Sequence, residues 1–195
     1  MARQGPIAKD TSTVALGLAQ VRVGDSSDNI NDIHPALSSS DSIGSLANTR
    51  FVGNTDWYRL EGGYPLIEEY VAPIREAAHL ECGFREVTPF NMALAYGVDP
   101  TDGSYSEVHS GEVALGNRSA PDYVRMEAQY TFPNATNTMT IIFPRAQVMA
   151  SVEVDLQAED AAVVPITFES KNASSDVTGG SSVWDAKPLG RIAWA

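Results

Sequence analysis

One stretch of this sequence, Thr88 to Gly97, has a convincing helical pattern, and it constrains the fold because the surrounding segments alternate like strands. Thr88 can cap the first turn with its hydroxyl, and Pro89 suits the first helical position, where its missing N–H would be unpaired anyway. Apolar residues then follow helical spacing as far as Gly97, which supplies a stop. A helix of about ten residues is marginal alone in water. We therefore expect it to pack on a sheet.

Period-two alternation predicts that sheet. The clearest pattern covers residues 122–132, where apolar side chains share one face and polar residues such as Glu127 and Gln129 share the other. In the strand expected at 75–87, Cys82 lies on the apolar face and is read as a core residue. Pro165 restricts its strand to an edge or a bulge. Strands are expected at 13–23, 56–61, 66–71, 75–87, 107–115, 122–132, 138–143, 151–156 and 163–168.

Three segments lack the alternation. Residues 1–12 read as a flexible N-terminal arm, and residues 25–48 form a long acidic loop, of a length that is usually functional or disordered. Residues 171–195 form a C-terminal arm with two tryptophans, Trp184 and Trp194, which are costly to leave in water. We expect this arm to dock, either on another molecule or back on its own domain. The prediction is one mainly β domain over residues 1–195, a β-sandwich or barrel with one short helix at 88–97.

Composition excludes several classes of function. The chain has 195 residues with 25 acidic and 13 basic side chains and a formal net charge of −12, which argues against binding nucleic acid by phosphate neutralisation. No run reaches the length of a membrane span and the N-terminus lacks the apolar core of a signal peptide, so we expect a soluble protein made in the cytoplasm, with no membrane insertion. A single cysteine allows no intrachain disulfide.

The sequence carries no recognisable catalytic signature, since it contains no P-loop, dinucleotide-binding, zinc-protease or nucleophile-elbow motif. His34, His79 and His109 lack ligand spacing, and the acidic residues at 25–32 lack the central glycine and the final glutamate of an EF-hand loop. We expect no catalytic residue, no metal site and no cofactor.

Two alternatives from other classes stay open. A carbohydrate-binding module would use Trp57, Tyr58 and Tyr64 as a stacking platform. A glycoside hydrolase would need a carboxylate pair, for which residues 81 with 86, or 68 with 69, are the candidates.

Four stretches carry a family resemblance. They are a strand ending in Arg85-Glu86-Val87, the Thr88–Gly97 helix, the segment Ile141-Ile142-Phe143-Pro144-Arg145-Ala146, and the closing Pro188-Leu189-Gly190-Arg191. In this order, over roughly residues 10 to 192, the chain resembles a tailed-bacteriophage major tail (tail tube) protein. The tube proteins of type VI secretion and other contractile injection systems are similar in fold and remain the alternative.

The resemblance implies a structural virion protein of the tail, assembled in the bacterial host cytoplasm. Each subunit of a hexameric ring would contribute its sheet to a continuous ring-forming β-barrel, and rings would stack into a negatively charged tube for DNA ejection. Implied partners are other copies of the chain, a baseplate or tail-tip initiator, a terminator, a tape-measure protein and possibly a sheath. DNA would pass through without specific binding.

Within this picture the sequence offers two sets of candidate residues. Candidate contacts between subunits or rings are Asp25, Asp28, Asp32, His34, Trp57, Trp184, Arg191 and Trp194. Candidate lumen-lining residues are Glu127, Gln129, Glu153 and Asp155. We expect the 25–48 loop and the 171–195 arm to become ordered only on stacking, so that removing residues 176–195 would leave a folded monomer that cannot grow a tube.

Overall fold

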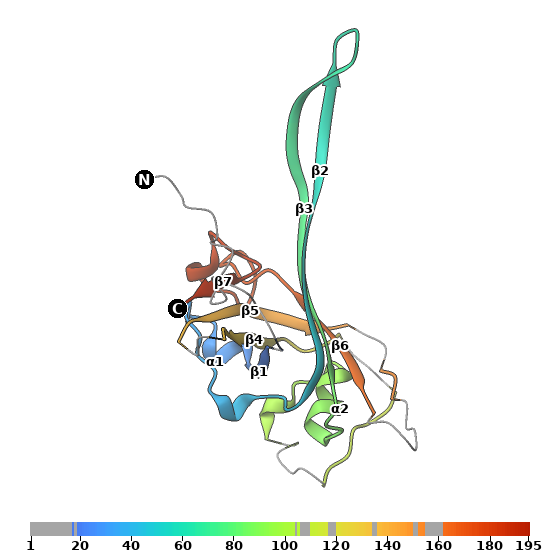
Figure 1. Ribbon diagram of the computed structural model, residues 1–195, viewed down its shortest axis with the longest axis vertical. Coiled ribbons are helices and arrows are strands. Elements are labelled where there is room, and N and C mark those ends of the chain that lie inside the picture. The colour runs from blue at the N-terminus through green and yellow to red at the C-terminus, as the bar shows by residue number, and fades with distance from the viewer. Residues whose placement is uncertain are drawn as a thin grey trace.

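Seven antiparallel strands form one sheet, and two of them extend far beyond the body as a hairpin (Figure 1). The computed structural model describes residues 17, 19–103, 105, 110–116, 120–133, 136–149, 152–154 and 162–195. The strands are β1 (Gln20–Asp25), β2 (Leu46–Gly62), β3 (Ile67–Phe84), β4 (Val124–Thr131), β5 (Thr138–Val148), β6 (Val164–Ser170) and β7 (Arg191–Trp194). The helices are α1 (Ser26–Asn29) and α2 (Pro89–Ala95), with 3-10 turns η2 (Ser39–Asp41), η3 (Pro100–Asp102) and η4 (Ser182–Trp184).

The strand order confirms the mainly β prediction and shows an open sheet. Along the sheet the strands follow the order β1, β4, β5, β6, β3, β2, and β7 pairs with the first half of β5. The end strands, β1 and β2, do not pair with each other in the part of the chain that the structure describes, so the single chain forms no closed barrel.

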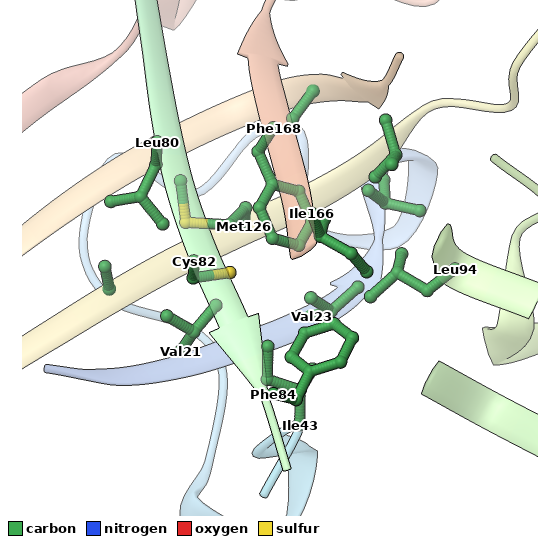
Figure 2. Packing of buried hydrophobic residues seen from close by; sticks show 14 of the residues in the cluster. Val21, Val23, Ile43, Leu80, Cys82, Phe84, Leu94, Met126, Ile166 and Phe168 are labelled. Carbon is green, nitrogen blue, oxygen red and sulfur yellow. The ribbon is translucent and has the colours of Figure 1, made fainter. Parts of the chain in front are cut away.

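The sheet curls so that strands from its two ends share one hydrophobic core (Figure 2). Val21 and Val23 of β1 belong to the same cluster as Leu80 and Phe84 of β3, and Leu94 of α2 joins them. Alternate side chains of β1, β4 and β6 and of the inner part of β3 contribute, as the alternation predicts. Burying a large apolar side chain of this kind stabilises the fold by about 1.5–3 kcal/mol.

Cys82 belongs to this core, as predicted. Its side chain is buried, and burial raises the pKa of the thiol from 9.0 to about 12. At neutral pH the thiol is therefore protonated and shielded from reagents in the folded chain.

Helix α2 lies where the sequence places it. The Thr88 hydroxyl accepts the N–H of Asn91 at 3.1 Å, and Gly97 ends the helical segment with φ 73°. The Asn91 side chain then donates to the carbonyl oxygens of Ile43 and Glu86, at 3.0 and 2.8 Å. These bonds hold the helix against the chain that enters β2 and leaves β3.

Replacing Thr88 with alanine is expected to lower the free energy of unfolding by about 1 kcal/mol, because the first turn of α2 loses its side-chain acceptor. Thr88→Ser keeps the hydroxyl and should retain most of that stability. Urea denaturation followed by circular dichroism measures both. Equal losses in the two variants would assign the effect to the methyl group instead of the cap.

Pro165 confirms another expectation, because it lies where β6 has a neighbour on one side only. Pro165 pairs with Gly83 of β3, while β5 joins β6 only from Phe168 onward. A proline is tolerated at such a position because no second ladder needs its missing N–H.

Several sequence expectations are wrong or lie outside the described residues. The strands expected at 56–61, 66–71 and 75–87 are parts of one long hairpin, and the loop at 25–48 contains a second short helix, α1. The described residues of the strands expected at 107–115 and 151–156 are not strands, although Val152 and Val154 pack against the core. Alternation reports which side chains are buried, not whether a neighbouring strand is available for backbone pairing.

The arm at 1–12, His109 and Asp155 lie outside the described residues. Across the described ranges, no helix has the length and apolarity needed to span a bilayer.

Candidate assembly interface

The β2–β3 hairpin is the part of the structure that most needs a partner. Strand β6, the other neighbour of β3, pairs with it only from Phe84 to His79. Beyond His79, no third strand among the described residues joins the hairpin, and Figure 1 shows it standing clear of the body. A two-stranded hairpin is marginally stable at best in water. The outer half therefore lacks the support that a third strand or a packed layer would provide.

Large apolar side chains are exposed along this outer half. At the tip, Tyr64 is fully exposed and Leu66 is 70% exposed. Monomeric soluble proteins rarely expose contiguous apolar patches of more than a few hundred Å² unless the surface binds something. The other exposed apolar residues of the outer half are Trp57, Tyr58, Leu60, Ile67, Tyr70, Val71 and Ile74.

Near the body, the hairpin has one apolar and one charged face. Leu80 and Cys82 point into the core, and Phe51 packs against Phe143 with ring centroids 6.3 Å apart. The side chains at the alternate positions of both strands point the opposite way, outward from the body. We call four of these the near charged face: Arg50, Asp56, Arg75 and Glu81.

Charges on the near charged face are balanced. Arg50 lies directly opposite Glu81, and the two form an ion pair at 3.1 Å. Asp56 is likewise opposite Arg75. Directly opposed residues of an antiparallel pair point to the same side, so each cation faces a carboxylate across the strands.

The outward face changes character at an irregularity in β3. Asp56 pairs with Arg75 but Trp57 pairs with Pro73, so Ile74 is an extra residue. Pro73 cannot donate a ladder hydrogen bond, and proline within sheets is confined to edges and bulges of this kind. Strand β2 has no insertion here, so its even-numbered residues stay on the outward face.

Beyond this bulge most of the outward face is apolar, although the Glu69 carboxylate lies beside Gly62 near the tip. The residues that form it are called here the far apolar patch: Tyr58, Leu60, Ile67 and Tyr70. The opposite face of the same segment carries an ion pair between Arg59 and Glu68 at 3.1 Å. That opposite face also carries Trp57 and Val71, so it is mixed beyond the bulge. The far apolar patch begins only outside the body, and the core of its own chain therefore cannot cover it.

This arrangement does not form the stacking platform that the alternative of a carbohydrate-binding module requires. Trp57 and Tyr58 are neighbours on β2 and therefore point to opposite faces, while Tyr64 lies in the turn at the tip. The three rings do not share one face, so they cannot stack together on a sugar chain.

A buried ion pair ties the acidic loop to the outer side of β4. Arg125 and Glu127 are 0% and 1% exposed, and Arg125 Nε lies 2.7 Å from Glu127 Oε1. The other Arg125 nitrogens donate to the carbonyl oxygens of Asn29, Asp32 and His34 at 2.6, 2.9 and 2.7 Å. The Glu127 carboxylate accepts the N–H groups of Ala36 and Leu37 at 2.9 and 3.2 Å.

The assignment of Glu127 to a lumen is therefore wrong. Alternation placed its side chain opposite the core, which is correct, but the 25–48 loop covers that side of the sheet. Of the other lumen candidates, Gln129 is half-buried, Glu153 is exposed, and Asp155 lies outside the described residues.

The C-terminal arm folds back on its own domain. Trp184 is 0% exposed, and its Nε1–H donates to the carbonyl oxygen of Ile30 at 2.6 Å. Ile30, Ile142, Ala173 and Trp184 form a second apolar cluster on the outer side of the sheet. The 25–48 loop and the 171–195 arm thus pack on each other within one copy of the chain. The expectation that these two segments become ordered only on stacking is therefore wrong. Removing residues 176–195 would open this cluster, so the truncated chain is not expected to fold normally.

Replacing Trp184 with phenylalanine is expected to lower the free energy of unfolding by about 1–3 kcal/mol, because the Ile30 carbonyl is left buried without this donor. Trp194→Phe is the matched control, since Trp194 is 66% exposed on β7. Guanidinium denaturation compares the two. A larger loss in the control would contradict the role given to the Trp184 hydrogen bond.

The remaining candidate contacts differ in accessibility. Asp25 is half-buried and caps α1 by accepting the N–H of Ser27, and Arg191 is half-buried on β7. The exposed members of the set are Asp28, Asp32, His34, Trp57 and Trp194.

The carboxylates considered for hydrolysis are held in local contacts. Glu68 pairs with Arg59, Glu81 pairs with Arg50, and Glu86 accepts the N–H of Ser45 at 2.9 Å. Searching the described residues finds no group of three or more His, Cys, Asp or Glu side chains placed to hold a metal ion.

Comparison with solved structures gives several similar chains, two of which are described here. No family model matches the sequence, and no curated protein matches it. The structure is similar to the tail of an empty gene transfer agent particle, with a TM-score of 0.41 and 12% identity over 80% of this chain and 92% of that chain. It is also similar to the tube-terminating cap of the anti-feeding prophage, with a TM-score of 0.41 and 12% identity over 100% of this chain and 94% of that chain. These values describe a loose likeness of chain trace.

Proposed function

We propose that this chain is a structural protein of a phage-type tail, whose copies associate side by side into rings that stack as a tail tube. The observation that carries this proposal is the outer half of the β2–β3 hairpin, a two-stranded projection with an uncovered apolar face. Such a projection gains stability only from a partner. The sequence resemblance to tail tube proteins supplies the kind of partner, which is another copy of the same chain.

The free strand edges support ring formation. Among the residues that the structure describes, one edge of β2 has no neighbouring strand, and β3 has none beyond His79 on its other side. Because β2 and β3 run in opposite directions, β2 of one copy can pair antiparallel with β3 of the next. A head-to-tail contact of this type closes into a ring and satisfies the backbone groups that an open edge leaves unpaired.

We assign the lumen to the near charged face in place of Glu127 and its neighbours. This face points away from the core of its own chain and carries opposed pairs, Arg50 with Glu81 and Asp56 with Arg75. Six copies per ring, the number implied by the resemblance, would bring roughly −72 formal charges at −12 each. DNA would then meet opposed residues of opposite charge inside a wall of overall negative charge, and would not adhere.

The remaining parts of the proposal follow from the tail role. The chain acts as scaffold, with no catalytic residue and no cofactor. It works in the virion tail after assembly in the host cytoplasm, together with an initiator, a terminator and a tape-measure protein. The tube of a contractile injection system is the second candidate, because such a tube would use the same hairpin and the same open edges.

Electron microscopy of the purified full chain tests the proposal, with sedimentation velocity over a range of concentrations. Hollow tubes or rings that appear as concentration rises would support it. A chain that stays monomeric at every concentration, with the hairpin protected from proteases, would contradict it, because the projection would then need no second copy.

A further inference from the structure

A pocket of about 680 Å³ lies between the start of α1, strand β5 and residues 171–179 of the C-terminal arm. Two cations line it, Arg145 and Lys171, against one carboxylate, Asp25. This is a local excess of positive charge in a chain with a formal net charge of −12. None of the lining residues belongs to β2 or β3, so the pocket is separate from the strand edges used for ring formation.

A β-bulge aims Arg145 into this pocket. Met126 of β4 pairs with Phe143, but the ladder resumes only at Ala146, which pairs with Val124. One residue of β4 therefore lies opposite two of β5. Phe143 and Ala146 both belong to the core, whereas strict alternation would have placed positions 143 and 145 on the core side together. The extra residue thus turns Arg145 away from the core, a common use of a bulge.

Arg145 is a buried cation without a carboxylate partner. It is 8% exposed, and no Asp or Glu among the described residues forms an ion pair with it. Its guanidinium donates once, from Nη1 to the carbonyl oxygen of Asn172 at 3.1 Å. Nε and Nη2 still reach solvent, because neither is among the fully buried, unpartnered polar atoms of the described chain. Arginine is almost never buried in this way unless it is paired.

The ring of Tyr123 fixes the plane of the guanidinium. Arg145 Cζ lies 3.9 Å from the centroid of that ring. Stacking uses the face of the guanidinium and leaves the N–H groups of its edge for an acceptor. Two parallel N–H groups match the two oxygens of a carboxylate. The half-buried Lys171 ammonium lines the same pocket and is shared with Glu169 at 2.7 Å.

The Asp25 carboxylate narrows the choice of anion. Its Oδ1 accepts the N–H and the hydroxyl of Ser27 at 2.6 and 2.9 Å, so it caps α1 and forms no ion pair with Arg145. Its charge repels a ligand of about −1.5 to −2, as a phosphate group carries, more than a carboxylate of single charge. The Tyr123 ring and Val177 add apolar walls, which suit a side chain with apolar neighbours.

We propose that this pocket receives an aspartate or glutamate side chain, flanked by apolar residues, from a protein other than this chain. The carboxylate accepts from Nε and Nη2 of Arg145, and Lys171 adds its charge at the rim. The inference goes beyond the proposed function, since ring formation uses the hairpin edges and leaves this pocket for a different protein.

Saturation-transfer difference NMR tests the pocket, because it reads binding of a small peptide whether or not the chain has assembled. The probes are acetyl-Leu-Glu-Leu-amide and acetyl-Leu-Gln-Leu-amide. We expect the glutamine peptide to bind more than about tenfold more weakly, since its neutral amide loses the charged hydrogen bonds. Equal binding of the two would overturn the proposal. Displacement of the glutamate peptide by inorganic phosphate at a lower concentration than by acetate would also overturn it.

Arg145→Met removes the guanidinium, and Lys187→Met is the matched control. Lys187 is a cation of the same arm that lies over the Trp184 ring and does not line the pocket. We expect Arg145→Met to weaken the glutamate peptide more than about tenfold and the control to leave it unchanged. Arg145→Lys keeps the charge without the fork and should not restore full affinity. Unchanged binding in Arg145→Met would overturn the site.

Thermal unfolding separates binding from a structural role. Arg125→Met leaves Glu127 buried alone and should lower the midpoint strongly, whereas Arg145→Met leaves no carboxylate unpaired and should change it little. An equal fall in the two variants would make Arg145 structural and overturn the proposal. Loss of assembly in a folded Arg145→Met chain would assign the pocket to a second copy and overturn the choice of partner. A chain that never assembles but binds the glutamate peptide would contradict the proposed function alone.

Discussion

Serine at Tyr58, Leu60 and Tyr70 together will leave the chain folded and stop it from assembling. These three side chains are 49%, 43% and 60% exposed and belong to neither apolar cluster, so the monomer loses little when they are shortened. In an assembly they would be the apolar centre of a contact. Buried interface aromatics often contribute 2 kcal/mol or more each, so we expect the concentration for assembly to rise more than about a hundredfold.

The opposite face of the same segment provides the matched control. Serine at Arg59, Glu61 and Glu68 shortens three side chains at the same distance from the body and removes the Arg59–Glu68 ion pair, which is exposed and worth little. Circular dichroism checks that both triple variants fold, and sedimentation velocity with electron microscopy follows assembly. Equal loss of assembly in the two variants would mean that the far apolar patch is not the contact.

Replacing Glu127 with alanine will lower the free energy of unfolding by about 3–5 kcal/mol, the usual effect of removing one partner of a buried ion pair. Arg125 would keep its charge at 0% exposure with no carboxylate beside it. The N–H groups of Ala36 and Leu37 would also lose their acceptor. We expect the acidic loop to detach from β4 before the core unfolds.

Guanidinium denaturation measures this loss, and limited proteolysis within residues 25–48 reports the loop. Gln129→Ala is the control, because Gln129 is the next residue on the same side of β4 and is only half-buried. The double variant Arg125→Met with Glu127→Leu should recover part of the stability, since no charge is then left buried. It cannot recover all of it, because three carbonyl oxygens still lose the Arg125 donors. A loss in Glu127→Ala no larger than in Gln129→Ala would contradict the structural role of the pair.

A charge reversal at Glu127 would not report on the charge of a lumen. Lysine at position 127 would place two cations together in a buried site, so any defect in tube function would report misfolding. Tests of lumen charge belong on the near charged face, where Arg50 and Glu81 are accessible and the core is untouched.

Local signals in the sequence predicted local structure well. The cap at Thr88, the proline after it and the stop at Gly97 define α2, because a helix end needs its free N–H and C=O groups satisfied within a few residues. Alternation likewise identified Leu80, Cys82 and Met126 as core, because side chains of a strand change sides at each residue. The restricted place of Pro165 followed from its missing N–H.

Only the tertiary structure decided what covers each surface. Nothing local shows that Glu127 accepts N–H groups from residues 91 and 90 positions away, or that Trp184 donates to a carbonyl 154 positions away. Nor does alternation show that three expected strands form one hairpin. In the sequence alone, Pro73 looks like the end of a strand, and only its pairing with Trp57 shows that β3 continues through it. By itself the sequence determined the helix, the strand faces and the core, all of which depend on neighbours in the chain. The buried ion pair, the docked arm and the register that creates the far apolar patch depend on pairing between separate segments, and only the folded chain brings those together.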